Sequence, residues 1–354
     1  MESLVPKATS NPNEAIKQLN NIYLFLGTYE GRVIRVEYII SEDKITSFSF
    51  KVSESSVRSI LNESRFLFVS GNDEIIRIYD IINLKEEGMV VTYNGTINTI
   101  LKHKNFLLAS GDNTSIDIWR MQDFTKIHIL KGHKASITSM VITKNGKLLI
   151  STGKDNKLLF WNLLKGTKLF RYSFKDSTCN KLLLTNSDKL LVCLCDSKII
   201  FLDITTKSVN FEEYIVAKLE NFKYKILDAF VIKNKLIVFK ALTFEVEVFD
   251  NFTDAIANKV ELISFKFQLE YPGEFTDNKD NVNELRVKIV NTISNKRISI
   301  VNIVYSNNEI ILYDINKIFK EINEKKVEST KILEFKTINL LSNARITSIA
   351  SSIN

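Results

Sequence analysis

Short apolar runs recur along the chain, each followed by a polar turn and a second apolar run that ends on an aromatic or acidic residue. Gly, Asn and Asp punctuate these units, which is the pattern of a β-hairpin. Seven units can be aligned, namely Leu24–Tyr38, Phe66–Asp80, Phe106–Arg120, Leu148–Asn162, Leu190–Asp203, Leu236–Asp250 and Ile298–Asp314. The pattern therefore predicts seven hairpins.

The hairpins repeat at a nearly constant spacing. The equivalent position is occupied by Glu37, Tyr79, Trp119, Trp161 and Leu202, at steps of 42, 40, 42 and 41 residues, and later steps lengthen to 47 at Phe249 and 64 at Tyr313. A period near 42 is that of a four-stranded propeller blade. A two-sheet sandwich also has short strands and frequent turns, but it gives no reason for such a period.

Further strands flank the hairpins. A strand is expected before most of them, as at Ser56–Leu61, Thr96–Leu101, Ile137–Thr143 and Leu227–Ile232, and a more polar strand after them, as at Leu169–Phe174. The middle strands are almost wholly apolar, as expected where neighbouring sheets cover both faces. Because such thin sheets need their neighbours to fold, we predict an all-β, seven-bladed β-propeller.

The two ends of the propeller are predicted to meet. Ala344–Ile353 matches the first strand of the other units, yet no hairpin follows it, and no such strand precedes the first hairpin. We expect Arg345–Ser351 to pair beside Leu24, so that the C-terminal strand closes the ring and removes an open sheet edge. Residues 1–21 are polar, without the apolar core of a signal peptide, and are expected to form a flexible tail to a single propeller over 22–354.

The unit from Lys131 to Asn162 resembles the WD repeat, in which a Gly-His pair is followed by strands and by an Asp six residues before a closing Trp-Asp. The resemblance implies that His133, Ser151, Asp155 and Trp161 form a hydrogen-bonded structural network. The chemistry is consistent, because an indole N–H only donates whereas a hydroxyl also accepts. Other units depart from the pattern: Asp73 and Tyr79 keep part of it, and the last three units keep little beyond a closing aspartate.

The sequence shows no pattern of an enzyme. His133, Ser151 and Asp155 have the composition of a catalytic triad, but the Trp at the repeat spacing favours a buried network. Nucleophile-elbow, dinucleotide and phosphate-loop motifs are absent. The three cysteines, Cys179, Cys193 and Cys195, lie far in sequence from the three histidines and are interpreted as core residues in a reducing compartment. We predict no catalytic or metal site, no cofactor, no small-molecule substrate and no membrane span.

Positive charge is concentrated in the middle of the chain. The net charge is +7, and Asp123–Asp176 holds eleven Lys and Arg against three Asp. In a propeller, the turns between blades and the turn inside each hairpin share one rim, which would bring together Lys131, Lys134, Lys154 and Lys157. The opposite rim would carry Lys144, Lys147 and Lys165. A basic rim suits RNA phosphates or an acidic partner by charge attraction, but an ordinary solvated, lysine-rich surface explains it equally well.

A narrower resemblance covers Ser70–Ile100 and the units that follow it. These residues, with the ending Asn343–Ala350, are similar to the family of the PAK-kinase-interacting WD protein of animals and its fungal counterpart in ribosome assembly. The resemblance implies a scaffold in the nucleolus or nucleus that binds assembly proteins of the large (60S) subunit precursor, with rRNA as a second partner through its phosphates. A cytoplasmic WD adaptor of a protein kinase or ligase complex is the alternative, and a propeller hydrolase is a third class.

Two irregular segments interrupt the later units. Residues 271–283 are a polar loop, and residues 315–329 have helical spacing of Ile318, Phe319 and Ile322 among charged residues. Either segment is interpreted as a partner contact or as a tolerated insertion.

Overall fold

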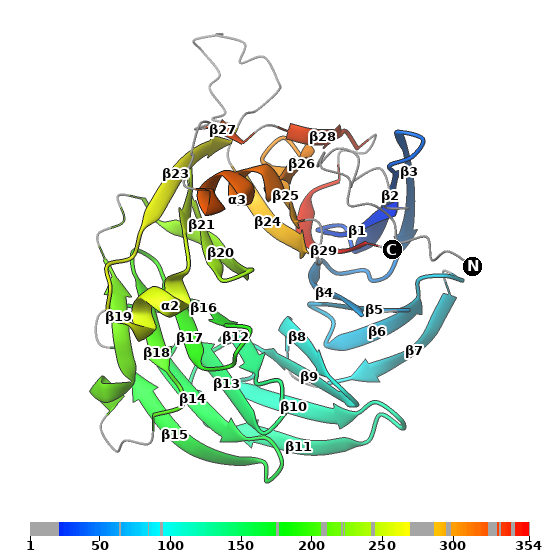
Figure 1. Ribbon diagram of the computed structural model, residues 1–354. Coiled ribbons are helices and arrows are strands. Elements are labelled where there is room, and N and C mark those ends of the chain that lie inside the picture. Colours follow the sequence, from blue (N-terminus) through cyan, green and yellow to red (C-terminus); the bar gives the residue numbers. More distant parts are fainter. Residues whose placement is uncertain are drawn as a thin grey trace, which may run out of the picture.

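Seven twisted β-sheets stand around a central axis in the computed structural model of the protein (Figure 1). The structure describes residues 21–354 apart from 64, 84, 93–94, 175–176, 207–210, 221, 223, 242–244, 270–286, 295–298, 325–330, 333, 341–343 and 354. Residues 1–20 of the predicted tail and the polar loop 271–283 lie outside the described residues, whereas Asn21, the last residue of the predicted tail, is described and begins the first strand. The predicted seven-bladed propeller is confirmed.

Blades 1 to 4 each contain four antiparallel strands, named in order from the axis outward. Blade 1 has β29 (Ile346–Ile353), β1 (Asn21–Thr28), β2 (Arg32–Ile39) and β3 (Lys44–Lys51). Blade 2 has β4 (Val57–Glu63), β5 (Phe66–Gly71), β6 (Ile75–Asp80) and β7 (Lys85–Val91). Blade 3 has β8 (Ile97–His103), β9 (Phe106–Gly111), β10 (Ser115–Arg120) and β11 (Lys126–Lys131). Blade 4 has β12 (Ile137–Ile142), β13 (Leu148–Gly153), β14 (Lys157–Asn162) and β15 (Thr167–Ser173).

Blades 5 to 7 carry the longer connections. Blade 5 has β16 (Cys179–Leu184), β17 (Leu190–Cys195), β18 (Ile199–Asp203) and β19 (Ile215–Leu219), with the 3-10 turn η1 (Phe211–Tyr214) before β19. Blade 6 has β20 (Ile226–Ile232), β21 (Lys235–Lys240), β22 (Glu245–Phe249), β23 (Ser264–Leu269) and the parallel β27 (Lys331–Ile332), with α2 (Phe252–Ala257) before β23. Blade 7 has β24 (Val287–Ser294), β25 (Ser299–Tyr305), β26 (Ile310–Asp314) and β28 (Glu334–Ile338), with α3 (Asn316–Asn323) after β26.

The core is divided among the interfaces between blades. Successive residues of a strand point to opposite faces of the sheet, so that Leu107 packs toward blade 2 and Leu108 toward blade 4. The same alternation sends Leu149 toward blade 3 and Ile150 toward blade 5. The described residues form seven buried apolar clusters, one at each interface. This explains why the middle strands are apolar on both faces.

Each inner strand has a β-bulge near its start, which the sequence did not reveal. The pairing skips one residue in each strand: Arg58, Asn98, Thr138, Asn180, Leu227, Lys288 and Thr347. A bulge re-aims its side chain, and in this propeller it links neighbouring blades. Thr138 Oγ1 donates to the carbonyl of Cys179 at 3.2 Å, and Thr347 Oγ1 donates to the carbonyl of Val57 at 2.6 Å.

Ring closure follows the prediction. β29 pairs antiparallel with β1, with Leu24 opposite Ser351 and Leu26 opposite Ile349, and Figure 1 shows the red β29 beside the blue β1. The expected pairing of the C-terminal strand with the N-terminal hairpin is therefore confirmed. Closure leaves β1 without an open edge.

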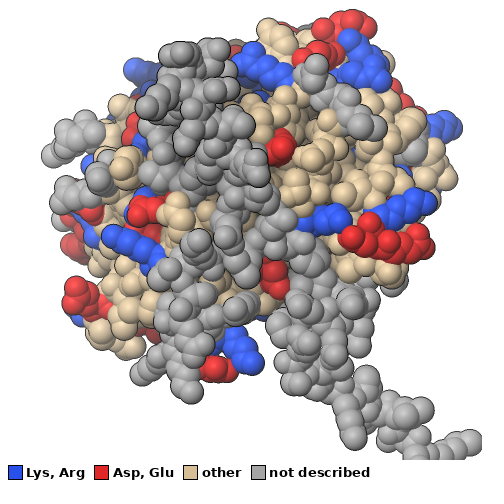
Figure 2. Space-filling model, turned by 90° about the horizontal axis from the view of Figure 1, so that it is seen from above, with Lys and Arg blue, Asp and Glu red and all other residues tan. Residues whose placement is uncertain are grey.

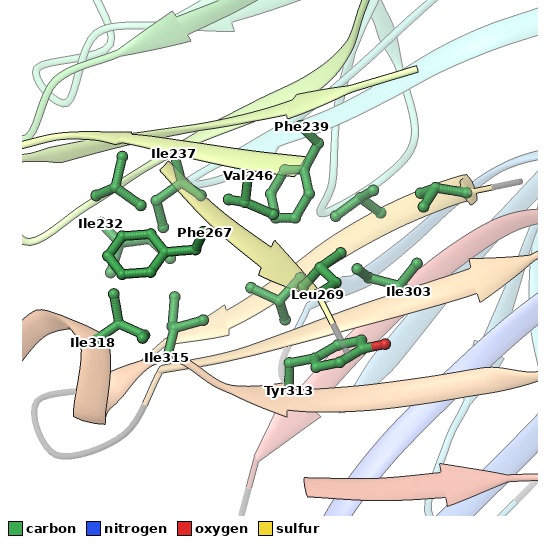
Figure 3. Close-up of a cluster of buried hydrophobic side chains, with 14 of the residues drawn as sticks. Ile232, Ile237, Phe239, Val246, Phe267, Leu269, Ile303, Tyr313, Ile315 and Ile318 are labelled. Atoms are coloured by element: carbon green, nitrogen blue, oxygen red, sulfur yellow. The ribbon is translucent and has the colours of Figure 1, made fainter. Parts of the chain in front are cut away.

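The helix expected within residues 315–329 is α3, and it belongs to the core. Ile318, Phe319 and Ile322 are buried at the interface of blades 6 and 7 with side chains from both sheets. Figure 3 shows Ile318 and Ile315 beneath Phe267 and Ile237 of blade 6. The apolar face of the helix therefore fills an interface between blades and is not available to a partner. Neither α2 nor β27 was expected from the sequence.

Candidate functional site

The four residues expected to form the WD network lie together in blade 4. His133, in the turn between β11 and β12, approaches Asp155 with Nδ1 to Oδ1 at 3.0 Å and Ser151 with Nε2 to Oγ at 2.8 Å. Trp161 Nε1 donates to Ser151 Oγ at 2.9 Å. Ser151 is fully buried and Asp155 also accepts the backbone N–H of Lys134 at 2.8 Å. The network thus ties the turn that enters blade 4 to β13, to β14 and to the turn between these two strands.

The direction of these hydrogen bonds follows from their chemistry. The indole of Trp161 can only donate, so Ser151 Oγ accepts from it and gives its own proton to His133. His133 must then accept at Nε2 and carry its proton on Nδ1, which donates to the Asp155 carboxylate. Burial lowers the pKa of His133, which keeps the imidazole neutral as this arrangement requires.

Asp155 stays ionised although it is enclosed. Burial acts to raise the pKa of this carboxyl, but the hydrogen bonds from the Lys134 backbone and from His133 outweigh it and hold the pKa below its ordinary value. Gly132 is needed beside the network, since a Cβ there would lie 2.9 Å from Cη2 of Trp161. The site is a buried, packed hydrogen-bonded unit.

Neighbouring blades keep only fragments of the network. In blade 2, Ser53 stands where blade 4 has His133, and its Oγ donates to Asp73 Oδ2 at 2.9 Å. The positions equivalent to Ser151 are held by Val69 in blade 2 and Ala109 in blade 3, neither of which has a hydroxyl. Ser70 and Ser110 come one residue later, at the place of Thr152; both are buried, and among the described residues neither serine Oγ has a hydrogen-bond partner. The complete network is therefore a local property of blade 4.

The four lysines of the predicted rim lie on one side of blades 3 and 4, which we call the upper rim: Lys131 ends β11 of blade 3, and Lys134, Lys154 and Lys157 belong to the entry turn and the central hairpin of blade 4. Lys131, Lys134 and Lys154 are exposed. Lys157 has a side chain only 15% exposed, and its Nζ lies 3.8 Å from Asp155 Oδ2. The backbone N–H of Lys154 donates to the carbonyl of Ser136 at 2.9 Å, which holds the two turns together. The free positive charge of this rim therefore resides mainly on three side chains.

The remaining candidate chemistry is sparse. The three cysteines are free and buried, and within the described part of the chain no three or more His, Cys, Asp or Glu side chains could hold a metal ion. A hollow of about 760 Å³ lies between blade 5 and α2, lined by Lys189, Asp203 and Thr253 among others, with no His or Cys in its lining. None of the described helices has the length and apolar character needed to span a bilayer.

Comparison with known proteins agrees with this geometry. The family described as WD domain, G-beta repeat matches residues 124–162, which include His133, Ser151, Asp155 and Trp161. The chain is a seven-bladed β-propeller that contains a WD repeat at residues 124–162.

The propeller is also similar to named relatives. It is 26% identical over 161 residues to Protein MAK11 of Saccharomyces cerevisiae, which is 38% of this chain and 39% of that protein. It is 27% identical over 133 residues to a p21-activated protein kinase-interacting protein 1-like protein of Danio rerio, and 30% identical over 102 residues to the protein of that name in Gallus gallus. These two matches cover 36% and 28% of each chain. The matched parts thus span well under half the length of these relatives.

Proposed function

We propose that the propeller is a non-catalytic scaffold in the assembly of the large (60S) ribosomal subunit, acting in the nucleolus or nucleus. Its similarity to Protein MAK11 is the observation that carries this proposal, together with the family resemblance of Ser70–Ile100 and Asn343–Ala350. Assembly proteins of the subunit precursor are its first partners, and rRNA is the second. Seven blades joined into a ring offer the stable, extended surface that a scaffold requires.

A structural role for the network supports a non-catalytic function. A nucleophile and its base must reach a substrate, whereas Ser151 is fully buried and His133 is 6% exposed. The indole N–H of Trp161 also donates a hydrogen bond to the hydroxyl of Ser151. The Ser, His and Asp side chains are thus better suited to holding a turn than to acyl transfer.

Purification of the tagged full-length chain tests the proposal. Precursor rRNA of the large subunit and its assembly proteins should co-purify. A second candidate is a kinase adaptor, because relatives at 27% and 30% identity are named for interaction with a p21-activated protein kinase. Recovery of a kinase or ligase complex without precursor particles would favour that adaptor, and turnover in an activity screen would favour a hydrolase.

The upper rim is the proposed contact with the acidic surface of an assembly protein. The triple variant Lys131→Glu, Lys134→Glu, Lys154→Glu reverses its exposed charges and spares Lys157, which neighbours Asp155. Association with the particle should fall strongly at physiological salt, because reversed charges repel an acidic partner. Unchanged association would remove the upper rim from the contact.

A further inference from the structure

Five exposed lysines lie on the side of blades 3 to 5 opposite the upper rim. All five are in turns that join the first strand of a blade to the second or the third to the fourth. They are Lys104 in blade 3, Lys144, Lys147 and Lys165 in blade 4, and Lys189 in blade 5. We call them the lower lysine cluster. Within the described residues, none of the five forms an ion pair.

Direct contacts hold these turns side by side. A Cβ on Gly146 would lie 2.7 Å from Nε2 of His103, so the turn carrying Lys144 and Lys147 packs on the end of β8 next to Lys104. The backbone N–H of Leu163 donates to the carbonyl of Lys147 at 2.9 Å, which joins the two lower turns of blade 4.

Blade 5 is joined to the same surface through Lys144. Its Nζ donates to the carbonyl of Asn186 at 2.6 Å, and its backbone N–H donates to Asp188. Lys189 follows directly in this turn. The five lysines therefore occupy one continuous surface that crosses three blades.

The local charge balance favours an anionic partner. Asp188 is engaged by the Lys144 backbone, and Asp123 at the edge of the surface is paired with Arg120 at 3.2 Å. Three carboxylates line a hollow together with Lys189, namely Asp203, Glu213 and Asp254, so the excess of positive charge is centred on blade 4. Elsewhere the two signs are mixed, and in the edge-on view of Figure 2 Lys and Arg side chains lie beside Asp and Glu. The lower lysine cluster has five exposed lysines, whereas the upper rim has three.

We propose that the lower lysine cluster binds the phosphate backbone of RNA without reading its sequence. Lysine ammonium groups bind phosphates as point charges, without the fixed geometry that the arginine fork imposes. The nearby Arg120 is already paired with Asp123. At the described lower turns of blades 3 to 5, Phe124 is the one aromatic side chain that is more than a third exposed, which is too little for a base-stacking platform.

The biological meaning of this inference rests on the proposed function, but its test does not. Purified full-length protein is titrated into a fluorescently labelled single-stranded RNA of random sequence and followed by anisotropy at several KCl concentrations. Five phosphate contacts predict a slope of log affinity against log salt of about −3.5. RNA binding can fail in this assay while particles still co-purify, and the reverse, so the two proposals fail separately.

A matched pair of variants locates the surface. The triple variant Lys104→Ala, Lys147→Ala, Lys165→Ala should reduce the magnitude of the salt slope by about 2. It should also weaken RNA binding about 50-fold near 0.15 M salt, because fewer counterions are released on binding. Lys131→Ala, Lys134→Ala, Lys154→Ala removes the same charge from the upper rim and should change affinity little. Lys144 is retained because its Nζ supports the turn of blade 5.

Three outcomes would overturn the inference. The first is the absence of RNA binding by the unaltered protein at low salt. The second is equal weakening by both triple variants, which would indicate only net charge. The third is tighter binding of polyglutamate than of RNA, which would assign the cluster to an acidic protein. Equal melting temperatures of the three proteins serve as the control for folding.

Discussion

Replacing Ser151 by alanine tests the hydrogen-bonded network of blade 4 most directly. The hydroxyl is fully buried, and it is the shared partner of Trp161 Nε1 at 2.9 Å and of His133 Nε2 at 2.8 Å. Its removal leaves one buried donor and one buried acceptor unpaired, each at a cost of about 1–3 kcal/mol. The variant should therefore lose about 2–6 kcal/mol of unfolding free energy.

A buried serine of blade 3, at the place of Thr152 in blade 4, provides a control within the same chain. Ser110 is as deeply buried as Ser151, but among the described residues its Oγ has no hydrogen-bond partner. Ser110→Ala deletes the same atom without breaking a bond, so its effect should stay within about 1 kcal/mol of zero. A comparable loss in both variants would mean that lost packing, and not the broken network, accounts for the effect of Ser151→Ala.

Urea denaturation followed by tryptophan emission measures both variants. The chain has two tryptophans, and Trp119 and Trp161 report on blades 3 and 4. The emission of native Ser151→Ala should also shift, because the indole of Trp161 loses its acceptor, whereas that of Ser110→Ala should not. An unshifted spectrum with unchanged stability in Ser151→Ala would refute the role assigned to the hydroxyl.

Three further predictions concern pH, thiol reactivity and ring closure. Burial lowers the pKa of His133 from 6.5, so below that pH the unfolded chain takes up a proton that the folded chain does not. The stabilising contribution is therefore complete above about pH 6.5, and it falls as the pH drops toward the lowered pKa of His133 in the folded protein. The melting temperature of His133→Gln should decline less between about pH 7.5 and 5.5 than that of the unaltered protein, and parallel declines would contradict this. Hydrogen bonding to Cys179 and burial raise the pKa of Cys195, and burial raises that of Cys179, so iodoacetamide should modify neither in the native protein and both in urea; rapid native labelling would disprove their enclosure. Deleting residues 345–354 removes β29 and exposes the edge of β1, so the product should elute as aggregates in size-exclusion chromatography, and a monomer with the original melting temperature would contradict closure.

The sequence predicted those features that repeat. Seven hairpins at a period near 42 identify a propeller because each blade must present the same apolar faces to its neighbours. The closing strand was predictable as well, since Ala344–Ile353 is an inner strand without a hairpin. The positions of His133, Ser151, Asp155 and Trp161 were suggested by the WD pattern, which fixes both residue type and spacing.

Features without a repeated signal could not be predicted from the sequence. The inner-strand bulges skip residues as different as Arg58, Thr138 and Leu227, because a bulge is a property of backbone pairing that several side chains tolerate. The lower lysines of blade 4 were expected on the rim opposite Lys131. The sequence did not predict that Lys104 and Lys189 lie on the same surface. Those two residues come from blades 3 and 5, and the contacts of the turn between β12 and β13 bring them to the same surface.

The uneven retention of the WD pattern along this one chain has a physical explanation. Each interface between blades has its own apolar cluster, so a blade can lose its polar network if other contacts fix its entry turn. In blade 2 the Ser53 to Asp73 bond serves this purpose, and at the interface of blades 6 and 7 the buried face of α3 adds apolar contacts. Blade 4 retains the complete network and also carries lysines of both the upper rim and the lower cluster. A rigid entry turn there would hold both charged surfaces in a fixed relation, which is what a scaffold with two kinds of partner requires.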